Sequence, residues 1–467
     1  MKRAIATVAA ALALAGCMVG PNYRSPAPGA PSQDPFYSGK SPAFTQDQPP
    51  GRWWSLFNDP VLDSLIEEAL RNNTDLRIAA ANLRRARAVL RETRSGLFPT
   101  ATASASATYS QQSGDQLQFQ GSASRGESYD AGIDATYQID LFGRIRRAIQ
   151  ASRADAGAAQ AAFDLSRITV AAETARAYAD ACSAGQQLAV ARETVRIQEQ
   201  TYDLTRRLLE GGRATALETG QAGSLLEQVR ATLPTLEAQR QTALFRLSVM
   251  TGRPPANFPR EVASCQSVPT LARPIPVGDG ATLLSRRPDV RQAERELAAA
   301  TARVGVATAS LYPSITLGGS VGTSATSLGG LGSSDSLRFS IGPLISWDLS
   351  NLFVGGARIA QAKADTEGRL ANFEGTWLKA LQETESALTR YARELDRRDA
   401  LKRARTQSAE AARIARLRYQ AGRDPFQVVL DAERSLASVE AELARSEAQL
   451  SDYSVSLFLA LGGGWQV

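Results

Sequence analysis

The sequence predicts a mixed fold in which membrane-spanning β-strands continue into very long α-helices. Three observations predict it: the chain repeats itself, each half carries two segments in which apolar and polar residues alternate, and each half carries long helical runs without proline. With 467 residues, 43% of them hydrophobic, the chain can bury a large core but is too long for one ordinary compact domain. We therefore expect a membrane β-barrel joined to a long α-helical barrel.

The amino terminus has the features of a lipoprotein signal peptide. Lys2-Arg3 precedes an apolar run from Ala4 to Ala15 that is too short to span a bilayer, and Gly16 and Cys17 follow. This ending resembles a bacterial lipobox, which implies cleavage before Cys17 and a covalent lipid (N-palmitoyl, S-diacylglycerol) on that residue. Met18 stands in place of the aspartate that marks retention at the inner membrane, so we expect the outer membrane. An ordinary signal peptide followed by a chance cysteine is the alternative.

The rest of the chain consists of two copies of one unit, because short motifs recur at a near-constant spacing. The matching pairs are Asp75-Leu76-Arg77 with Asp289-Val290-Arg291, Leu97-Phe98-Pro99-Thr100 with Leu311-Tyr312-Pro313-Ser314, and Gly212-Arg213 with Gly422-Arg423. The predicted organisation is a signal peptide (1–16), an extended lipid-anchored segment (17–58), a first repeat (59–252), a proline-rich connector (253–287), a second repeat (288–462) and a tail (463–467).

Each repeat begins with a helix, over 59–97 (with a possible break near Asn72) and 288–311, and a proline ends it. The pattern then changes from the helical period to strict alternation, which predicts β-hairpins over 100–141 and 314–349. Apolar positions of these strands include Tyr129, Ile133, Tyr137, Ile139, Ile315, Leu317, Val321, Leu337, Phe339, Ile341 and Ile345. Ser, Thr, Asp and Gly fill most of the positions between them, and the loops are rich in Gly and Ser.

Four strands of about ten residues, apolar on one face and polar on the other, have the length and pattern of outer-membrane barrel strands. A soluble sheet is the alternative, but its apolar face would need a covering layer, and the rest of the chain is long helix. Known barrels begin at about eight strands, and open sheet edges are not tolerated in lipid. We therefore expect strands from several chains to close the barrel, and a trimer would supply twelve.

Two helical runs without proline, over 143–210 and 355–421, are rich in Ala, Arg, Glu and Gln. Apolar residues recur in them at spacings of three and four, which predicts coiled-coil seams. The seams are Leu165, Ile168, Ala172, Ala175, Ala179 and Cys182, and Leu370, Phe373, Trp377, Leu381, Thr384, Leu388, Tyr391 and Leu395. A turn then sends each run back, giving helical hairpins over 143–250 and 355–461. At about 1.5 Å per residue each reaches roughly 100 Å, which suits a conduit across the periplasm.

Composition argues against catalysis. The sequence has no histidine, which excludes Ser-His-Asp, Cys-His and His-ligated metal chemistry, and three cysteines cannot make a four-thiolate zinc site. The net charge of +6 comes from arginines interleaved with acidic residues, so we expect no nucleic-acid partner. Cys182 and Cys265 can form a disulfide in an oxidising periplasm or remain two unlinked thiols, and the unlinked pair is the expectation.

The combined motifs resemble the outer-membrane efflux proteins of the TolC type, and most of all the NodT-like lipoproteins that serve multidrug pumps. The matching segments are Cys17 to Tyr23, Trp53 to Pro60, Arg286 to Val290, Leu311 to Ser314 and Arg418 to Gly422. The resemblance implies a homotrimer in the outer membrane of a Gram-negative bacterium, with a twelve-stranded barrel and a helical tunnel closed at its periplasmic tip. It also implies two partners, a periplasmic adaptor (membrane fusion) protein and an inner-membrane pump of the RND type.

The resemblance further implies a periplasmic gate in the segment from Tyr419 to Arg434. Asp431 matches the family's constriction carboxylate, and three copies around a threefold axis would form an acidic ring. Gln427 lies one helical turn before it, and Tyr419 and Arg434 match groups that hold neighbouring helices. Gln221 is the repeat counterpart of Asp431 and adds no second charge. The alternative for Asp431 is an exposed carboxylate paired with Arg434 on the same helix.

Gly212-Arg213 and Gly422-Arg423 are expected at the tips of the helical hairpins. Helix termination is one role for them, because glycine accepts the left-handed conformation after a helix. Docking of the adaptor's helical hairpin is the role that the resemblance implies.

The sequence thus predicts a passive exit duct of a tripartite efflux pump, without catalysis, for drugs or other small molecules. One alternative is the outlet of a type I protein-secretion or metal-efflux system, although only three methionines are available as metal ligands. Another is a structural envelope lipoprotein that does not conduct. A scaffold would not need a barrel with a polar interior.

Overall fold

The computed structural model describes residues 18–26, 35–111, 125–271, 274–280, 283 and 286–463. The predicted signal peptide, Cys17 and the last four residues of the tail lie outside the described residues. The chain divides into two compact units. Unit 1 comprises Met1–Pro26, Asn82–Gln160 and Gln292–Glu374, and unit 2 comprises Ala27–Ala81, Ala161–Arg291 and Gly375–Val467.

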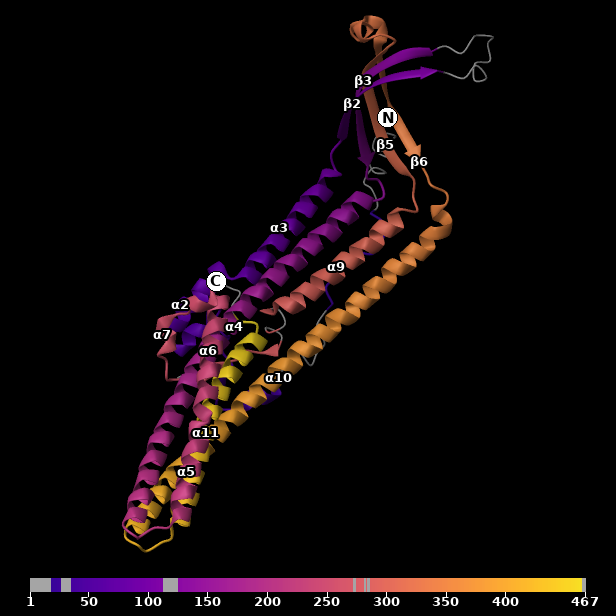
Figure 1. Ribbon diagram of the computed structural model, residues 1–467. Coiled ribbons are helices and arrows are strands. Elements are labelled where there is room, and N and C mark those ends of the chain that lie inside the picture. The colour runs from indigo at the N-terminus through magenta and orange to yellow at the C-terminus, as the bar shows by residue number, and fades with distance from the viewer. Residues whose placement is uncertain are drawn as a thin grey trace. The chain divides into compact units, whose positions relative to one another are not determined.

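Unit 1 contains an antiparallel sheet in the order β2-β3-β5-β6 (Figure 1). The strands are β2 (Thr100–Gln111), β3 (Arg125–Ile139), β5 (Ser314–Ala325) and β6 (Leu337–Ser346). Two short 3₁₀ turns (Leu328–Gly332 and Ser334–Ser336) lie between β5 and β6. The register places Val321 opposite both Ile133 and Phe339, so the predicted apolar positions share one face. In this chain Phe339 and Ile341 are each 78% exposed on that face.

The opposite face of the sheet is polar, and one pair of glycines lets two strands approach closely. Gly132 of β3 lies opposite Gly322 of β5, and a Cβ atom on Gly322 would lie 2.6 Å from the carbonyl oxygen of Ala131. Arg338 lies opposite Gly322 on the other side, and its guanidinium reaches Asp130 of β3 (3.5 Å). The missing side chain of Gly322 therefore allows an ion pair to cross a whole strand.

Each strand of the sheet is joined to a helix, and the helices of unit 1 keep the same order. The helices are α3 (Thr74–Ser95), α4 (Arg144–Glu210), α9 (Pro288–Ala309) and α10 (Asn351–Gln420), and each of the four also extends into unit 2. Polar contacts join neighbours: Arg87 of α3 to Gln160 of α4, Arg303 of α9 to Asp155 of α4, and Arg369 of α10 to Glu296 of α9. The four strands thus continue into a layer of four helices (Figure 1).

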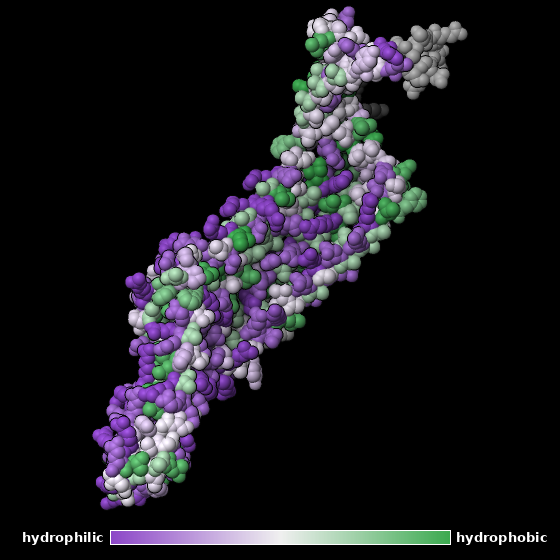
Figure 2. Space-filling view, in the orientation of Figure 1, coloured by the Kyte–Doolittle hydropathy of each residue, from purple (hydrophilic) through white to green (hydrophobic). Residues whose placement is uncertain are grey.

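Hydrophobic side chains are also exposed where β6 joins α10. Leu352, Phe353 and Val354 in the first turn of α10 are exposed, with Phe353 at 88%. Figure 2 shows a hydrophobic patch on the surface where α10 begins. Trp347 precedes the turn and its indole N–H donates to the carbonyl of Leu311 (3.1 Å). None of the helices within the described ranges combines the length and the apolar composition that a membrane-spanning helix requires.

Unit 2 is mostly helical. Besides parts of the long helices it contains α2 (Pro60–Asn72), α5 (Ala216–Arg230), α6 (Thr232–Met250), α7 (Arg260–Ala263) and α11 (Phe426–Ala460). Asp59 caps α2 by accepting from the N–H groups of Val61 and Leu62. A parallel pair of short strands, β1 (Phe44–Thr45) and β4 (Ile275–Pro276), joins the amino-terminal segment to the connector. The core centres on Trp53, whose ring stacks on Phe458 at 4.9 Å.

Three features of unit 2 differ from the expectation. The returning arm of the helical hairpin predicted over 143–250 is two helices and not one, because Pro234 lacks the N–H that would bond the carbonyl of Arg230 and its ring clashes with that carbonyl. The segment 17–58 is not extended throughout, since its described part contains 3₁₀ turns at Tyr37–Lys40 and Trp53–Phe57.

The third difference is a disulfide between Cys182 and Cys265, where two unlinked thiols were the expectation. Their Cα atoms lie 4.9 Å apart, although 83 residues separate them in the sequence. Gly185 makes room for this contact, because a Cβ atom there would lie 2.1 Å from the carbonyl oxygen of Cys265. The disulfide ties the connector to α4, and no local pattern in the sequence reports such a distant contact.

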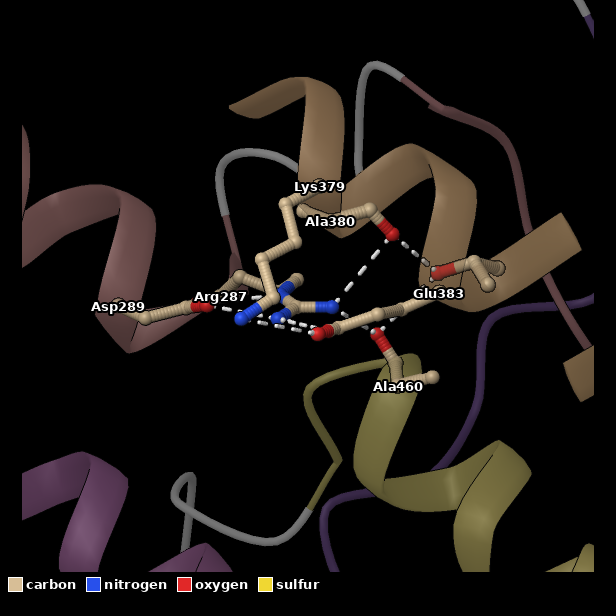
Figure 3. A network of polar contacts seen from close by, with 7 residues as sticks. Arg287, Asp289, Lys379, Ala380, Glu383 and Ala460 are labelled. Atoms are coloured by element: carbon tan, nitrogen blue, oxygen red, sulfur yellow. Dashed lines mark hydrogen bonds and ion pairs between the residues drawn. The ribbon is translucent and has the colours of Figure 1, made fainter. Parts of the chain in front are cut away.

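Arg287 holds several chain segments of unit 2 together (Figure 3). Its side chain is 9% exposed and donates to both carboxylate oxygens of Asp289 (3.0 and 2.6 Å) and to Glu383 (2.8 Å). It also donates to the backbone carbonyls of Ala460 (3.1 Å) at the end of α11 and Ala380 (3.5 Å) in α10. One guanidinium thereby satisfies acceptors from α9, α10 and α11.

We expect Arg287→Gln to lower the free energy of unfolding by about 2–3 kcal/mol, because the acceptors around it lose their charged donor. The loss is smaller than the about 3–5 kcal/mol of a fully buried pair because Asp289 and Glu383 are partly exposed. Thermal unfolding of the purified protein in detergent measures the effect as a drop of several degrees in Tm. Arg286→Gln is the matched control, since among the described residues Arg286 donates only to the neutral oxygens of Gln48 and Pro49. Equal losses in both variants would contradict this role of Arg287.

Candidate functional site at the tips of the helical hairpins

The two helical hairpins of unit 2 turn through the same backbone geometry. After α4, Gly212 has a φ of +70°, and the N–H of Arg213 donates to the carbonyl of Leu208 (2.7 Å). After α10, Gly422 has a φ of +65°, and the N–H of Arg423 donates to the carbonyl of Arg418 (2.9 Å). This is the pattern of a helix that ends on a left-handed glycine. The termination role predicted for both glycines is thus present in the backbone.

The residues that follow the two glycines differ between the tips. In the first tip, Thr215 and Glu218 form a reciprocal capping box that starts α5. In the second tip, Arg418 donates two hydrogen bonds to Asp424 (2.6 and 2.8 Å), and Pro425 precedes α11. The guanidinium of Arg418 lowers the pKa of the Asp424 carboxyl, so the second turn is held by an ionic contact.

Arg213 and Arg423, the residues predicted to dock a partner, lie on the exposed surface of the tips. Within the described ranges neither guanidinium makes a hydrogen bond or an ion pair, although both backbone N–H groups do. Each tip therefore presents one cationic side chain without an intramolecular partner.

Helices α5, α10 and α11 meet directly behind the tips in a small apolar cluster. Its buried members are Ala222 and Leu225 of α5, Ala415 of α10, and Phe426, Val429 and Leu430 of α11. The ring of Tyr419 packs against Phe426 at 5.4 Å and is half-buried. Burial and the charge of Glu218 raise the pKa of Tyr419. Its hydroxyl oxygen is buried and has no hydrogen-bond partner in the part of the chain that the structure describes.

Asp431 and Gln427 lie one turn apart on the exposed face of α11, and the amide Nε2 of Gln427 donates to Oδ1 of Asp431 (3.0 Å). The alternative contact from Asp431 to Arg434 does not form, and the exposed Arg434 side chain makes no contact with any described residue that would satisfy it. Gln221 lies on α5 beside the buried Ala222, and no contact between described residues joins it to Asp431. The structure thus groups Gln427 with Asp431 and Tyr419 with Phe426.

Glu433 is a polar residue of this region that the sequence analysis missed. It is 2% exposed, accepts from the hydroxyl of Thr201 on α4 (3.0 Å), and lies 3.6 Å from Nε of Arg416 on α10. Its second oxygen, Oε2, is buried without a partner among the described residues. Burial raises the pKa of Glu433, against the smaller effects of Thr201 and Arg416. The signal was its place in the apolar stripe of α11, since 426, 429, 430 and 433 fall on one helical face.

No metal centre accompanies this site: within the described ranges, no three Cys, Asp or Glu side chains are grouped as metal ligands would be. The arrangement can instead hold helices together and present charge. Asp431 is exposed, Glu433 links α11 to α4 and α10, and the tips carry free cations.

Comparison with known proteins gives a consistent result. The family described as "Outer membrane efflux protein" matches residues 65–253 and 281–463. Nodulation protein T of Rhizobium leguminosarum bv. trifolii is 29% identical over 97% of this chain and 96% of its own length. Outer membrane protein OprJ of Pseudomonas aeruginosa is 33% identical over 97% of this chain and 94% of its own length.

Among solved structures, the outer-membrane channel OprN is 36% identical and superposes with a TM-score of 0.92 over 97% of this chain and all of that chain. The fold, the doubled architecture and the family match agree with the resemblance that the motifs indicated, which is thereby confirmed. The chain belongs to the outer membrane efflux protein family.

Proposed function

We propose that three copies of this chain form the passive exit duct of a tripartite efflux pump, which carries drugs or other small molecules across the periplasm and the outer membrane. The four-stranded sheet with one apolar face carries this proposal, because β2 and β6 are its outer strands and each leaves one backbone edge without a partner among the described strands. In lipid such edges must be paired, and three sheets in a ring give the twelve strands of a closed barrel.

The polar faces of the three sheets would then line the barrel, and the helices that continue from each strand would extend the wall into the periplasm. Nothing in this duct needs a catalytic group, since energy enters at an inner-membrane partner. A pump of the RND type and a periplasmic adaptor are the proposed partners. The free guanidinium groups of Arg213 and Arg423 at the tips support docking of the adaptor, because they offer charge that no described neighbour neutralises.

Asp431, with Gln427 one turn before it, is the proposed constriction of the duct. Three copies of the exposed Asp431 would form an acidic ring that favours cations and narrows the passage. Arg434 is available to contact a neighbouring copy, because its exposed side chain finds no partner among the described residues of its own chain. Tyr419, whose hydroxyl is buried, would instead hold α10 to α11 within each copy through its ring contact with Phe426. These contacts would hold the tips closed until a partner engages them.

The acidic ring is tested by single-channel conductance of the purified protein in planar bilayers. We expect small, cation-preferring currents from the wild type and larger, less selective currents from Asp431→Ala, because the ring loses its charge and bulk. Glu410→Ala is the control: in the part of the chain that the structure describes, this exposed carboxylate pairs only with Arg413 on its own helix, so its loss should leave the currents unchanged.

Large, steady wild-type currents would rule out the proposed gate. An absence of current from folded trimers of both forms would rule out Asp431 as the constriction and favour the alternative of a non-conducting scaffold.

Glu433 gives the tip a pH-dependent stability. Its pKa is raised in the folded protein, so its contribution is intact below its ordinary value of 4.5 and is lost as pH rises through the raised value. We therefore expect the Tm of the wild type, relative to that of Glu433→Gln, to fall as the pH rises above the ordinary carboxyl value of 4.5. Glu440→Gln is the control, since Glu440 of α11 also pairs with an arginine of α10 but is not fully buried. A pH-independent difference for Glu433→Gln would contradict the buried carboxyl.

The lipid anchor is a further part of the proposal, and it makes Cys17 the first residue of the mature protein. Metabolic labelling with palmitate should label the wild type and fail to label Cys17→Ser, because the acyl groups attach to that residue. The double variant Cys182→Ser, Cys265→Ser is the control and should keep the label, since these residues form the disulfide. A labelled Cys17→Ser protein, or an unlabelled wild type, would exclude this anchor.

A further inference from the structure

Unit 1 contains a pocket of about 490 Å³ that has no role in the proposed duct. It lies between the amino-terminal residues 21–23, the first turns of α4 and one side of α9. Three arginines line it, Arg147 and Arg153 from α4 and Arg295 from α9, and no acidic residue is part of the lining.

Arg147 is the buried wall of this pocket. It is 2% exposed, and its guanidinium donates four hydrogen bonds, all to neutral oxygens. The acceptors are the carbonyls of Val19 and Gly20 and the side-chain amides of Asn22 and Gln150, each at 3.0 Å. A buried cation without a counter-ion is unfavourable, and burial lowers the pKa of Arg147 accordingly. A bound anion would therefore stabilise the charged form of Arg147.

The other two arginines leave the pocket positive as well. Arg153 is exposed and makes no ion pair with a described residue. Arg295 pairs with Glu294, but this carboxylate also accepts the hydroxyl of Tyr23 and is itself only 12% exposed at its side chain. Among the described residues, the Glu294 carboxylate thus balances one of the three guanidinium groups, which leaves an excess of about two positive charges.

Close packing shapes the pocket in advance. Gly20 has a φ of +85°, and a Cβ atom on it would lie 2.5 Å from Cα of Gly305 on α9. A Cβ atom on Gly305 would lie 2.7 Å from the side chain of Arg147. The amino-terminal segment therefore crosses α9 where its Gly20 contacts Gly305, and the hydrogen bonds from Arg147 to Val19 and Gly20 hold it there. Asn22 and Gln150 turn their oxygens to Arg147, so their NH₂ groups remain as further donors.

We propose that this pocket binds the phosphate of a phospholipid headgroup in the periplasmic leaflet of the outer membrane. Guanidinium groups match phosphate oxygens with paired N–H donors, and amide NH₂ groups complete such a site. The pocket begins within about 5 Å of the start of α4, which directly follows β3, so a headgroup beneath the barrel strands lies within reach. That the pocket opens toward the outside of the duct, and not into its interior, rests on the proposed lipid anchor, because the residues that follow an acylated Cys17 must lie on the outer surface of the duct.

Binding of phosphatidylglycerol to the delipidated full-length protein in detergent, followed by native mass spectrometry, tests this proposal. Dioleoylglycerol, which lacks the phosphate, is the matched lipid probe, and inorganic phosphate is the soluble one. We expect the double variant Arg153→Gln, Arg295→Gln to weaken phosphatidylglycerol binding about tenfold or more, because two charged donors are lost. Arg303→Gln is the control variant: Arg303 also lies on α9 but pairs with Asp155 outside the pocket.

Equal affinity of the wild type and the double variant would overturn the proposal, as would equal binding of dioleoylglycerol. Stabilisation of the wild type by inorganic phosphate without binding of phosphatidylglycerol would make the site one for free phosphate and would overturn its membrane source. The same variants should keep wild-type conductance and palmitate labelling. Failure of those two measurements in the wild type would instead count against the proposed duct and its anchor.

Discussion

The unpaired edges of β2 and β6 are the constraint on which the rest of the proposed assembly depends. Backbone groups at these edges find no partner in their own sheet, and the apolar face beside them is largely exposed in the single chain. In a bilayer the backbone groups at these edges must be hydrogen-bonded, and this requires further strands that close the sheet into a barrel with the apolar face toward lipid. Because each strand is joined to a helix in the same order, closing the sheets also closes the helical layer beneath them.

Within one chain, two buried or nearly buried arginines, Arg287 and Arg147, have different structural roles. Arg287 collects acceptors from three helices and is balanced by two carboxylates, so it stabilises unit 2. Arg147 holds the amino-terminal residues of unit 1 to α4 by hydrogen bonds to neutral oxygens, and no described carboxylate pairs with its charge. The first arrangement is complete inside the chain, whereas the second is completed only by something outside it. This contrast is why the second site, and not the first, points to a ligand.

The strands and seams could be predicted from the sequence because burial on one face leaves a strict period in the residues, as at Ile133, Val321 and Phe339. The glycine turns at Gly212 and Gly422 were also predictable, since positive φ selects glycine. Three contacts could not be predicted, because each joins residues far apart in the sequence. They are the disulfide between Cys182 and Cys265, the hydrogen bonds of Arg147 to the amino-terminal residues, and the contacts of Glu433 with α4 and α10. The break between α5 and α6 can be related to one residue of the sequence, because Pro234 interrupts the helical hydrogen bonds at this point.

The two tips share a backbone turn but not the residues around it. The Gly-Arg turn occurs in both halves, whereas the pair of Arg418 with Asp424 and the exposed Asp431 occur only in the second. In a ring of three chains, a protein that recognises the shared turn would meet six equivalent positions. A protein that recognises the ionic pair would meet three, at alternate positions around the ring. The stoichiometry of a bound partner therefore reports which of these features it contacts.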